Sequence, residues 1–377
     1  MRCCVIGLAL ATSEIAQAQT SVTLYGIIDT GIDYASNVAQ VSNVAVVQGS
    51  GAKLVQESSG VPLGSRWGLH GVEDLGGGLN VIFTLESGFS SVNGALGATS
   101  TLFSRNAFVG LSSAQYGTVT FGKQWDAIVD DVESFTLNGN LGGWYFSHPN
   151  DMDNTDNGFS INNDVKYVSP SVGGLKAEAH YSFGGQAGQY SNDSSYGGGL
   201  SYSSGAFGAG AAYLRVNNPE TAVAGYQSGG GYLNSVYGDA LAQARSQQIV
   251  AVGAAYHFDA FQLLGDFTNV VFQQGDAGRN VVFQNYEISG IYTLTPAWTL
   301  AGGYTYTTGR DHETGEEPKY QQINLLAQYA FSKRTALYLM AALQRALGSA
   351  RYAQIAGFNP SGTDQQAVVR LGLTHHF

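Results

Sequence analysis

The densest group of acidic side chains in this sequence lies between residues 126 and 135. Four carboxylates fall within eight positions there: Asp126, Asp130, Asp131 and Glu133. Apolar residues separate them at helical spacing, so a short helix could pack its apolar side against the protein and turn the acids toward water. Such carboxylates attract cations and orient dipolar solutes without covalent chemistry. A solvated loop face is the simpler alternative, and the residues alone leave it open.

Residue types that carry covalent catalysis are scattered through the chain. The seven histidines are spread along the sequence, and no Gly-x-Ser-x-Gly nucleophile motif occurs. A hydrolase needs a nucleophile, a base and an orienting group within hydrogen-bond reach, and no such set is evident. We therefore expect that the chain is not an enzyme.

Two groups of possible metal ligands also fit poorly. His375 and His376 are adjacent, so on a strand they would point to opposite faces. Four residues before Gly158 offer many oxygens, but Thr155 takes one ligand position of an EF-hand and no Glu closes the loop; the four are Asp151, Asp153, Asp156 and Asn157. We predict no metal and no cofactor, while a divalent cation on these loop acids stays open.

Composition favours an all-β protein. The 377 residues include 51 glycines and 22 tyrosines against 7 prolines and 3 methionines, which suits many strands with tight turns. Beyond the N-terminus no run of 18 apolar residues occurs, so helical membrane spans are excluded. The net charge of -11 argues against a nucleic-acid partner, because phosphate binding needs clustered Lys and Arg.

The first residues are typical of a secretory signal peptide. Arg2 precedes a short apolar stretch, and Ala16-Gln17-Ala18 provides the small-x-small pattern of a cleavage site. We predict a signal peptide at 1–18, cleaved after Ala18, and one domain at 19–377. Both cysteines, Cys3 and Cys4, fall in the signal peptide. A buried first strand is the alternative.

Alternation of apolar and polar residues at period two begins at residue 21. Segments 21–34 and 79–86 each have one apolar face and one polar face. Seven short turns, at 74–78, 112–116, 170–174, 204–205, 257–260, 295–296 and 331–333, alternate with eight longer polar segments, at 36–64, 91–101, 126–162, 184–195, 217–246, 274–279, 309–318 and 346–366. This pattern predicts an antiparallel transmembrane β-barrel of about 16 strands.

The last strand is expected to close this barrel. It runs from Ala367 to Phe377, and the terminal Phe377 lies on its apolar face. Pairing with the first strand would leave no unpaired edge in lipid. An edge strand of a soluble sandwich is the alternative.

Several motifs resemble those of the Gram-negative general porins, especially the betaproteobacterial type, over essentially the whole chain after residue 18. They lie at 21–26 (SVTLYG), 65–79 (SRWGLHGVEDLGGGL), 85–89 (LESGF), 105–111, 117–126, 163–167 (NDVKY) with Ser169-Pro170, and 372–377 (GLTHHF). The resemblance implies a sixteen-stranded homotrimer whose third loop, here 126–162, folds into each pore.

The same resemblance assigns a pore constriction. Arg66 and Arg105 match arginines on the family's barrel wall, His70 shares the lumen face with Arg66, and Glu86 matches a lumen-facing acid. The four acids of 126–133 would face this wall and create a transverse field. Where the family commonly has a third basic residue, this chain has Ser160, so we expect a preference for cations. Alternation along the strand places Lys123 on the lipid-facing side, where its ammonium could reach the membrane interface instead. Whether Lys123 belongs to the pore lining therefore stays open.

Together these features predict an outer-membrane general diffusion porin that passes ions and small hydrophilic solutes. Expected partners are other copies of the chain, membrane lipid and lipopolysaccharide, and the barrel-assembly machinery through the C-terminal strand. A substrate-specific channel is the nearest alternative, but Trp125, Trp144 and Tyr145 are too few for an aromatic track. A barrel enzyme of the outer membrane is a further alternative.

Overall fold

The computed structural model describes residues 21–42, 45–98, 100–223, 233–275 and 279–377. The predicted signal peptide and both cysteines lie outside these ranges. The strands of the main sheet are β1 (Ser21–Val38), β4 (Ala52–Ser59), β5 (Arg66–Asp74), β6 (Leu79–Gly88), β7 (Asn106–Ser113), β8 (Gly117–Gln124), β9 (Ile161–Val168), β10 (Leu175–Ser182), β11 (Ser195–Ser204), β12 (Phe207–Asn217), β13 (Ala244–Phe258), β14 (Phe261–Gln274), β15 (Arg279–Thr293), β16 (Trp298–Asp311), β17 (Pro318–Ala330), β18 (Thr335–Gly348) and β19 (Gln365–His376). No helix of the described residues is long and apolar enough to cross a membrane.

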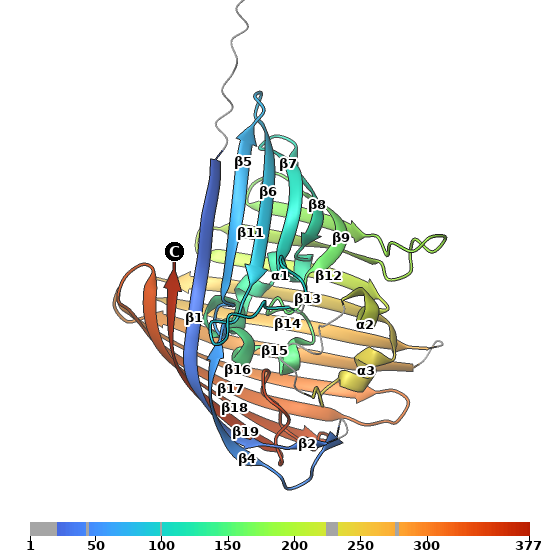
Figure 1. The fold of residues 1–377 in the computed structure, drawn as a ribbon, viewed down its shortest axis with the longest axis vertical. Coiled ribbons are helices and arrows are strands. Elements are labelled where there is room, and N and C mark those ends of the chain that lie inside the picture. The colour runs from blue at the N-terminus through green and yellow to red at the C-terminus, as the bar shows by residue number, and fades with distance from the viewer. Residues whose placement is uncertain (1–20, 43–44, 99, 224–232, 276–278) are drawn as a thin grey trace, which may run out of the picture.

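The main sheet closes on itself as an antiparallel barrel (Figure 1). One edge of β1 pairs with β19, from Ile27 opposite His376 to Ala35 opposite Val368. Its other edge pairs first with β5 and then with β4, so β4 and β5 are two halves of one interrupted strand. Counted this way, the seventeen described strands of the sheet form a sixteen-stranded barrel, as predicted.

All seven predicted short turns connect the expected neighbours, but the first predicted long loop was wrong in part. Segment 36–64 contains β4 and a small hairpin of β2 (Val41–Ser42) and β3 (Ala45–Val46), and β1 continues to Val38. The sequence of β4 is polar, with Gln56, Glu57 and two serines, so it lacks the apolar alternation that marks its neighbours. Pairing with β1 satisfies its backbone whatever the side chains are.

The barrel is apolar outside and polar within. On β19, Leu371 and Leu373 are half exposed on the outer face, whereas the neighbouring Arg370 is fully buried on the inner face. The same alternation continues on β17, where Ile323 and Leu325 face outward and Asn324 faces inward. This inversion of an ordinary protein core places the outer leucines against lipid and the polar residues around the lumen.

Aromatic rings gather near the short turns. Tyr256 and Phe258, at the end of β13 where the turn at 257–260 begins, have ring centroids 4.5 Å apart, and Trp298 packs on Tyr329 at 5.0 Å. Amphipathic aromatic side chains are favoured where hydrocarbon meets water. These rings therefore mark one membrane interface, at the end of the barrel that carries the short turns.

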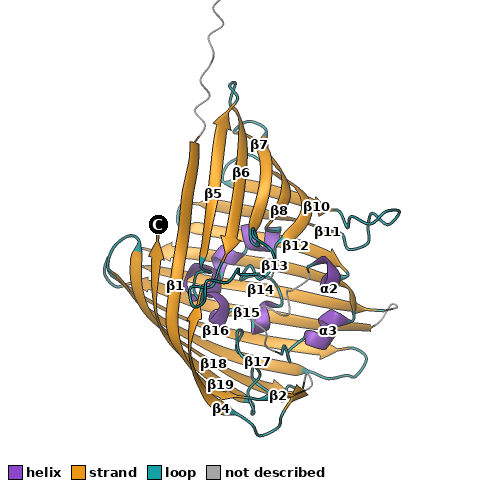
Figure 2. Cartoon of the chain, in the orientation of Figure 1, coloured by secondary structure: helices purple, strands orange, loops and turns teal. Residues whose placement is uncertain are grey.

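The third loop, residues 125–160 between β8 and β9, folds along the inner wall. It begins with helix α1 (Ala127–Asp131), which contacts β11 and β12, and continues through short helical turns that contact β13, β14 and β17. In Figure 2 these helical segments lie within the ring of strands, whereas α2 (Pro219–Ala222) and α3 (Gly238–Ala242) lie near the strand ends. The predicted inward loop is confirmed, and β9 begins at Ile161, slightly earlier than the predicted boundary.

Glycines on the inner wall make room for this loop. A Cβ on Gly210 would lie 1.9 Å from the carbonyl oxygen of Asp131, and one on Gly199 would lie 2.1 Å from the Asp131 carboxylate. Neither distance is compatible with a methyl group, so the loop can approach β11 and β12 only because both positions are glycine.

We predict that Gly210→Ala pushes α1 off the wall and into the lumen. Overpacking of this kind costs about 1–3 kcal/mol, and the narrowed pore should carry a smaller single-channel current. Gly302→Ala is the control, because its new Cβ would meet only ordinary contacts, the nearest at 3.4 Å. Equal currents for the two variants would contradict the tight fit between loop and wall.

Candidate pore constriction

The lumen narrows to a cavity of about 450 Å³ between the barrel wall and the third loop. Its charged lining residues come from both sides: Arg66 and Arg105 from the wall, and Asp130, Glu133 and Asp156 from the loop. Two expected basic residues and two of the expected acids, together with Asp156, therefore face one shared space.

A second inward segment, residues 60–65 between β4 and β5, completes the lining of this cavity. It is held by Asp29, whose carboxylate accepts a hydrogen bond from the Val61 amide at 3.1 Å. The Ser65 hydroxyl donates to the Asp29 carbonyl at 2.9 Å. The third loop is tied to the same segment, because the Trp144 amide donates to the Val61 carbonyl at 3.0 Å. The interruption of the barrel strand is thus a structural part of the constriction.

The basic side of the cavity is an ordered ion-pair group. Arg105 Nε lies 2.7 Å from Glu86 Oε1, and Arg66 Nη1 lies 3.9 Å from the same oxygen. The other Glu86 oxygen accepts a hydrogen bond from the Tyr25 hydroxyl at 2.8 Å. The guanidinium of Arg105 also lies 4.9 Å from the ring centroid of Trp125. Glu86 therefore neutralises part of the positive charge on its own wall.

The acidic side is presented by Asp130 and Glu133. Asp130 forms an ion pair with Lys166 of β9. Glu133 Oε1 accepts a hydrogen bond from the Asn157 side chain at 2.6 Å, and Asn157 in turn accepts one from Arg105 at 3.2 Å. Asn157 thus bridges the two sides of the cavity and holds their charges at a fixed separation.

The other two acids of the predicted set do not face the water-filled space. Asp126 is fully buried and caps α1, since its side chain accepts hydrogen bonds from the Ile128 amide at 2.8 Å and from Asn154 at 2.6 Å. Burial raises the pKa of Asp126 to about 6. Asp131 is buried against β11, beside Gly199. The expectation that all four acids face water differs from the structure at these two positions, because α1 is too short to turn every acid outward.

Three further residues singled out from the sequence do not line the cavity. His70 shares the lumen face of β5 but is four residues, or about 13 Å, from Arg66, and its ring packs 5.5 Å from that of Tyr25. It therefore lies nearer the short turns than the constriction does. Lys123 lies where the pairing of β8 with β9 shifts register, and its ammonium donates to Asn162 Oδ1 at 3.0 Å. Ser160 is buried and bonds to the Ser104 carbonyl.

Phe377 lies at the barrel seam. Its amide donates to the Gly26 carbonyl at 3.0 Å, and the Gly26 amide donates to the Phe377 carbonyl at 3.2 Å. A Cβ on Gly26 would lie 2.2 Å from the Phe377 ring, so glycine is required where the ring crosses β1. The last residue is thereby paired with the first strand.

Sequence reasoning missed several residues of this site. Asn157 and Asp156 line the cavity, but the sequence analysis placed them only in the inward loop, as possible ligands of a poorly fitting calcium site. Asp151 instead accepts hydrogen bonds from the amides of Asp156 and Gly158 at 2.8 and 3.0 Å, as a loop-closing residue does. The sequence analysis also missed that the fold brings His148 together with three acids, Asp153, Asp266 and Glu287. These groupings depend on how the loop folds back, which has no periodic signal.

A closed barrel that is apolar outside and polar within, narrowed by an inward loop between opposed charges, defines a membrane channel of the porin class. The sequence agrees: the model of the Gram-negative porin family matches residues 5–348, and the chain belongs to this family. Members of this family are outer-membrane channels without enzymatic activity.

Known porins align with this chain, one over nearly its whole length and another over a shorter part. Outer membrane porin protein 32 of Delftia acidovorans is 29% identical over 98% of this chain and 97% of its own length. An outer membrane porin protein of Bordetella pertussis is 50% identical over a shorter stretch, 29% of each protein.

Solved structures show the same fold. An anion-selective porin from Comamonas acidovorans superimposes with a TM-score of 0.75 at 25% identity, covering 95% of this chain and all of that one. The trimer form of OmpT, an outer membrane protein of Vibrio cholerae, has a TM-score of 0.67 at 14% identity, covering 95% of this chain and 99% of that one.

Proposed function

We propose that this porin is a general diffusion channel with a preference for cations. As a member of its family, the chain forms an outer-membrane channel for passive diffusion. The finer proposal concerns which solutes it favours, and it rests on the charges of the cavity.

The proposal of cation preference rests on the balance of charge at the constriction. Three carboxylates and two guanidinium groups line the cavity, while Glu86 pairs with Arg105 and Lys166 pairs with Asp130. With these partners included, four carboxylates face three cations, an excess of one negative charge when all are ionised. A cation that crosses this space meets a net negative potential, whereas an anion meets a barrier. The Comamonas acidovorans porin is described as anion-selective. At 25% identity, the side chains of this cavity rather than the shared barrel decide the preference of this chain.

The test is a reversal potential across a planar bilayer with unequal potassium chloride concentrations on the two sides. Net cation preference should give a potential of the sign expected for potassium, and it should grow at low ionic strength, where charges are less screened. A potential of the sign expected for chloride would overturn the proposal.

The preference should weaken as the solution becomes acidic. Burial raises the pKa of Glu133 to about 7, with help from nearby Asp130, although the Asn157 hydrogen bond and the arginines oppose the shift. Below that pH the side chain is neutral and the cavity loses one negative charge. One charge at about 8 Å in water is worth about 0.5 kcal/mol, which changes a cation-to-anion permeability ratio by up to about fivefold.

Reversal potentials measured from pH 8 to pH 5 would check this expectation. The wild-type ratio of potassium to chloride permeability should fall with a midpoint near pH 7, and Glu133→Gln should show the low ratio throughout. A wild-type ratio that is constant over this range would contradict it.

We also propose that the chain assembles as a homotrimer, in line with its family, whose members are typically trimeric. The export signal at 1–18, contacts with lipopolysaccharide and recognition of the C-terminal strand by the barrel-assembly machinery belong to the same proposal. Chemical cross-linking of native membranes should give a band of three chains, and N-terminal sequencing should begin at Gln19. A monomeric band alone would refute the trimer.

A further inference from the structure

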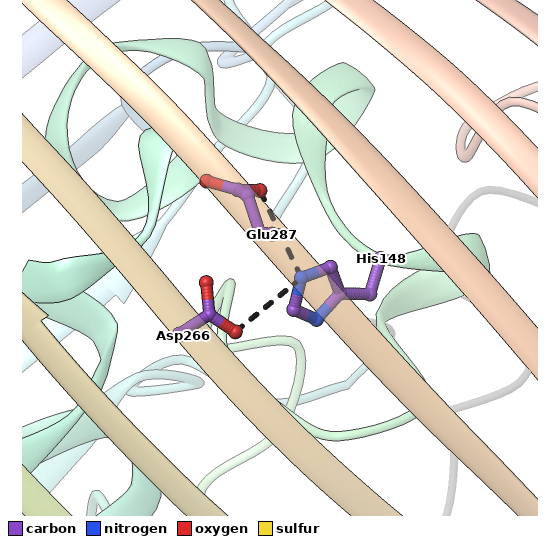
Figure 3. Close-up of side chains that lie close together, drawn as sticks. All are labelled: His148, Asp266 and Glu287. Atoms are coloured by element: carbon purple, nitrogen blue, oxygen red, sulfur yellow. Dashed lines mark ion pairs between the residues drawn. The ribbon is translucent and has the colours of Figure 1, made fainter.

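A buried group of ionisable side chains, none of which lines the constriction cavity, joins the third loop to the barrel wall. His148 of the loop points at Asp266 of β14 and Glu287 of β15 (Figure 3). Its Nε2 atom lies 3.6 Å from Asp266 Oδ2 and 3.8 Å from Glu287 Oε2, and all three side chains are fully buried. One potential ligand atom from each residue lies within 4.8 Å of the other two.

The orientation of the His148 imidazole is fixed by contacts to Nδ1, the nitrogen that does not face Asp266 and Glu287. Its Nδ1 atom lies 2.5 Å from Asp153 Oδ2, and Asp153 is itself fixed by hydrogen bonds from Thr268 at 2.5 Å and Asn285 at 3.0 Å. A carboxylate that holds Nδ1–H leaves Nε2 as the free basic nitrogen, which is the arrangement found around metal-ligating histidines.

Glu287 accepts hydrogen bonds from the Leu137 amide at 2.7 Å and from the hydroxyls of Ser289 and Thr305 at 2.9 and 3.3 Å, but within the described part of the chain the other two residues lack such partners on the sides that face one another. Among the described residues, no protein group forms a hydrogen bond with His148 Nε2 or with either carboxylate oxygen of Asp266. Asp266 and Glu287 are also direct cross-strand neighbours in the register of β14 and β15. Like charges opposite each other destabilise a sheet, and unpaired buried charges are costly.

A cation would resolve this arrangement. Asp153, Asp266 and Glu287 bring three carboxylates to a single imidazole. Protonation of the imidazole would leave an excess of two negative charges, whereas a divalent ion beside a neutral imidazole would leave an excess of one.

We infer that His148, Asp266 and Glu287 bind a divalent transition-metal ion of the zinc class. A nitrogen ligand favours such metals over calcium or magnesium. Ligand atoms about 2.1 Å from a tetrahedral zinc are about 3.4 Å apart, so the two nitrogen-to-oxygen distances need to contract by only a few tenths of an ångström. The metal bridges loop and wall, so its occupancy holds the third loop in place and thereby sets the width of the pore.

The direct test measures zinc in the refolded protein. The chain is unfolded in the presence of a chelator and refolded in detergent with or without inorganic Zn²⁺. Unbound zinc is then removed, and the zinc content of the protein is measured. The site predicts about one zinc per wild-type chain. Asp266→Asn and His148→Gln should bind at least tenfold less.

The control is His180→Gln. His180 is also buried and pairs with one carboxylate, at 3.1 Å from Asp164 Oδ1, but it has no place in the three-residue group. This variant should keep the full zinc content. Co²⁺ in the wild-type chain gives a second readout that does not depend on a variant folding, because four-coordinate cobalt absorbs visible light far more strongly than six-coordinate cobalt.

Wild-type protein with less than a tenth of a zinc per chain and no intense cobalt absorption would overturn the inference. So would Asp266→Asn protein that retains all its zinc. A third contrary result would be stability to urea that does not change with Zn²⁺ and that falls as the pH rises. A protonated His148, rather than a metal ion, would then balance the carboxylates, and the metal site would be refuted.

Discussion

Replacing Arg370 by methionine should lower the free energy of unfolding by about 3–5 kcal/mol, the usual effect of breaking a buried ion pair. Arg370 is fully buried inside the barrel seam. Its guanidinium donates to Asp29 at 3.0 Å and to Asp33 at 2.7 Å, and its Nε donates to the Tyr338 hydroxyl at 2.7 Å. Loss of the cation leaves both carboxylates buried without a positive partner.

The same network reaches the third loop, so its loss should also affect conduction. The Tyr145 hydroxyl donates to Asp33 at 2.9 Å. Without Arg370 the two aspartates repel each other, and the loop loses a fixed anchor. We therefore expect noisier single-channel currents in Arg370→Met protein than in the wild type.

Arg345→Met is the matched control for stability. Arg345 forms an exposed pair with Asp364 at 3.4 Å, and exposed pairs contribute about 0–1 kcal/mol. Urea unfolding in detergent measures both variants. Adding Asp29→Asn and Asp33→Asn to Arg370→Met should restore much of the stability, because no buried charge then remains. Equal unfolding midpoints for Arg370→Met and Arg345→Met would refute the role of the network.

Neutralising the two sides of the constriction should shift ion selectivity in opposite directions. The double variant Asp130→Asn with Glu133→Gln removes two negative charges from the cavity and also frees Lys166 from its partner. The double variant Arg66→Gln with Arg105→Gln removes two positive charges. At about 8 Å in water each charge is worth about 0.5 kcal/mol for a cation and as much, with the opposite sign, for an anion, so each double variant should change the permeability ratio by up to about 30-fold.

Reversal potentials of the two double variants test this symmetry. The first should favour chloride and the second should favour potassium more strongly than the wild type does. Glu317→Gln serves as the control, since Glu317 lies at the exposed rim beside Lys319. Shifts of the same sign in both double variants would show that this cavity does not control selectivity.

The strands were predictable because their chemistry is periodic. Lipid on one side and water on the other impose an alternation such as Leu371, Gly372, Leu373 and Thr374, which a single strand reveals. β4 was not predicted as a strand because its sequence is polar and does not alternate regularly between apolar and polar residues. The inward course of segment 60–65 was not predicted either, because no pattern in its sequence indicates the hydrogen bond to Asp29 that holds it.

The wall side of the candidate site was easier to predict than the loop side, where two of the four predicted acids line the cavity and two do not. Parity and family resemblance placed Arg66, Glu86 and Arg105 around one cavity wall. In the loop, neighbouring acids have unrelated environments: Asp130 and Glu133 line the cavity, while Asp126 caps a helix. A five-residue helix followed by irregular turns gives each side chain its own direction, and helical spacing cannot predict these directions.

Ion conduction through this barrel requires a water-filled passage that runs past Glu133. The sequence has only Cys3 and Cys4, both in the predicted signal peptide, so Glu133→Cys would place a single reactive thiol at the constriction of the exported chain. Leu371→Cys, on the outer face, is the control that a charged, water-soluble thiol reagent cannot reach through lipid.

The decisive measurement is single-channel current in potassium chloride before and after a bulky, charged methanethiosulfonate is added to Glu133→Cys protein. The structure predicts an open channel whose current drops in discrete steps as each pore is labelled, while Leu371→Cys protein keeps its current. A current that stays constant after mass spectrometry shows complete labelling of the thiol at position 133 would contradict a pore at this site.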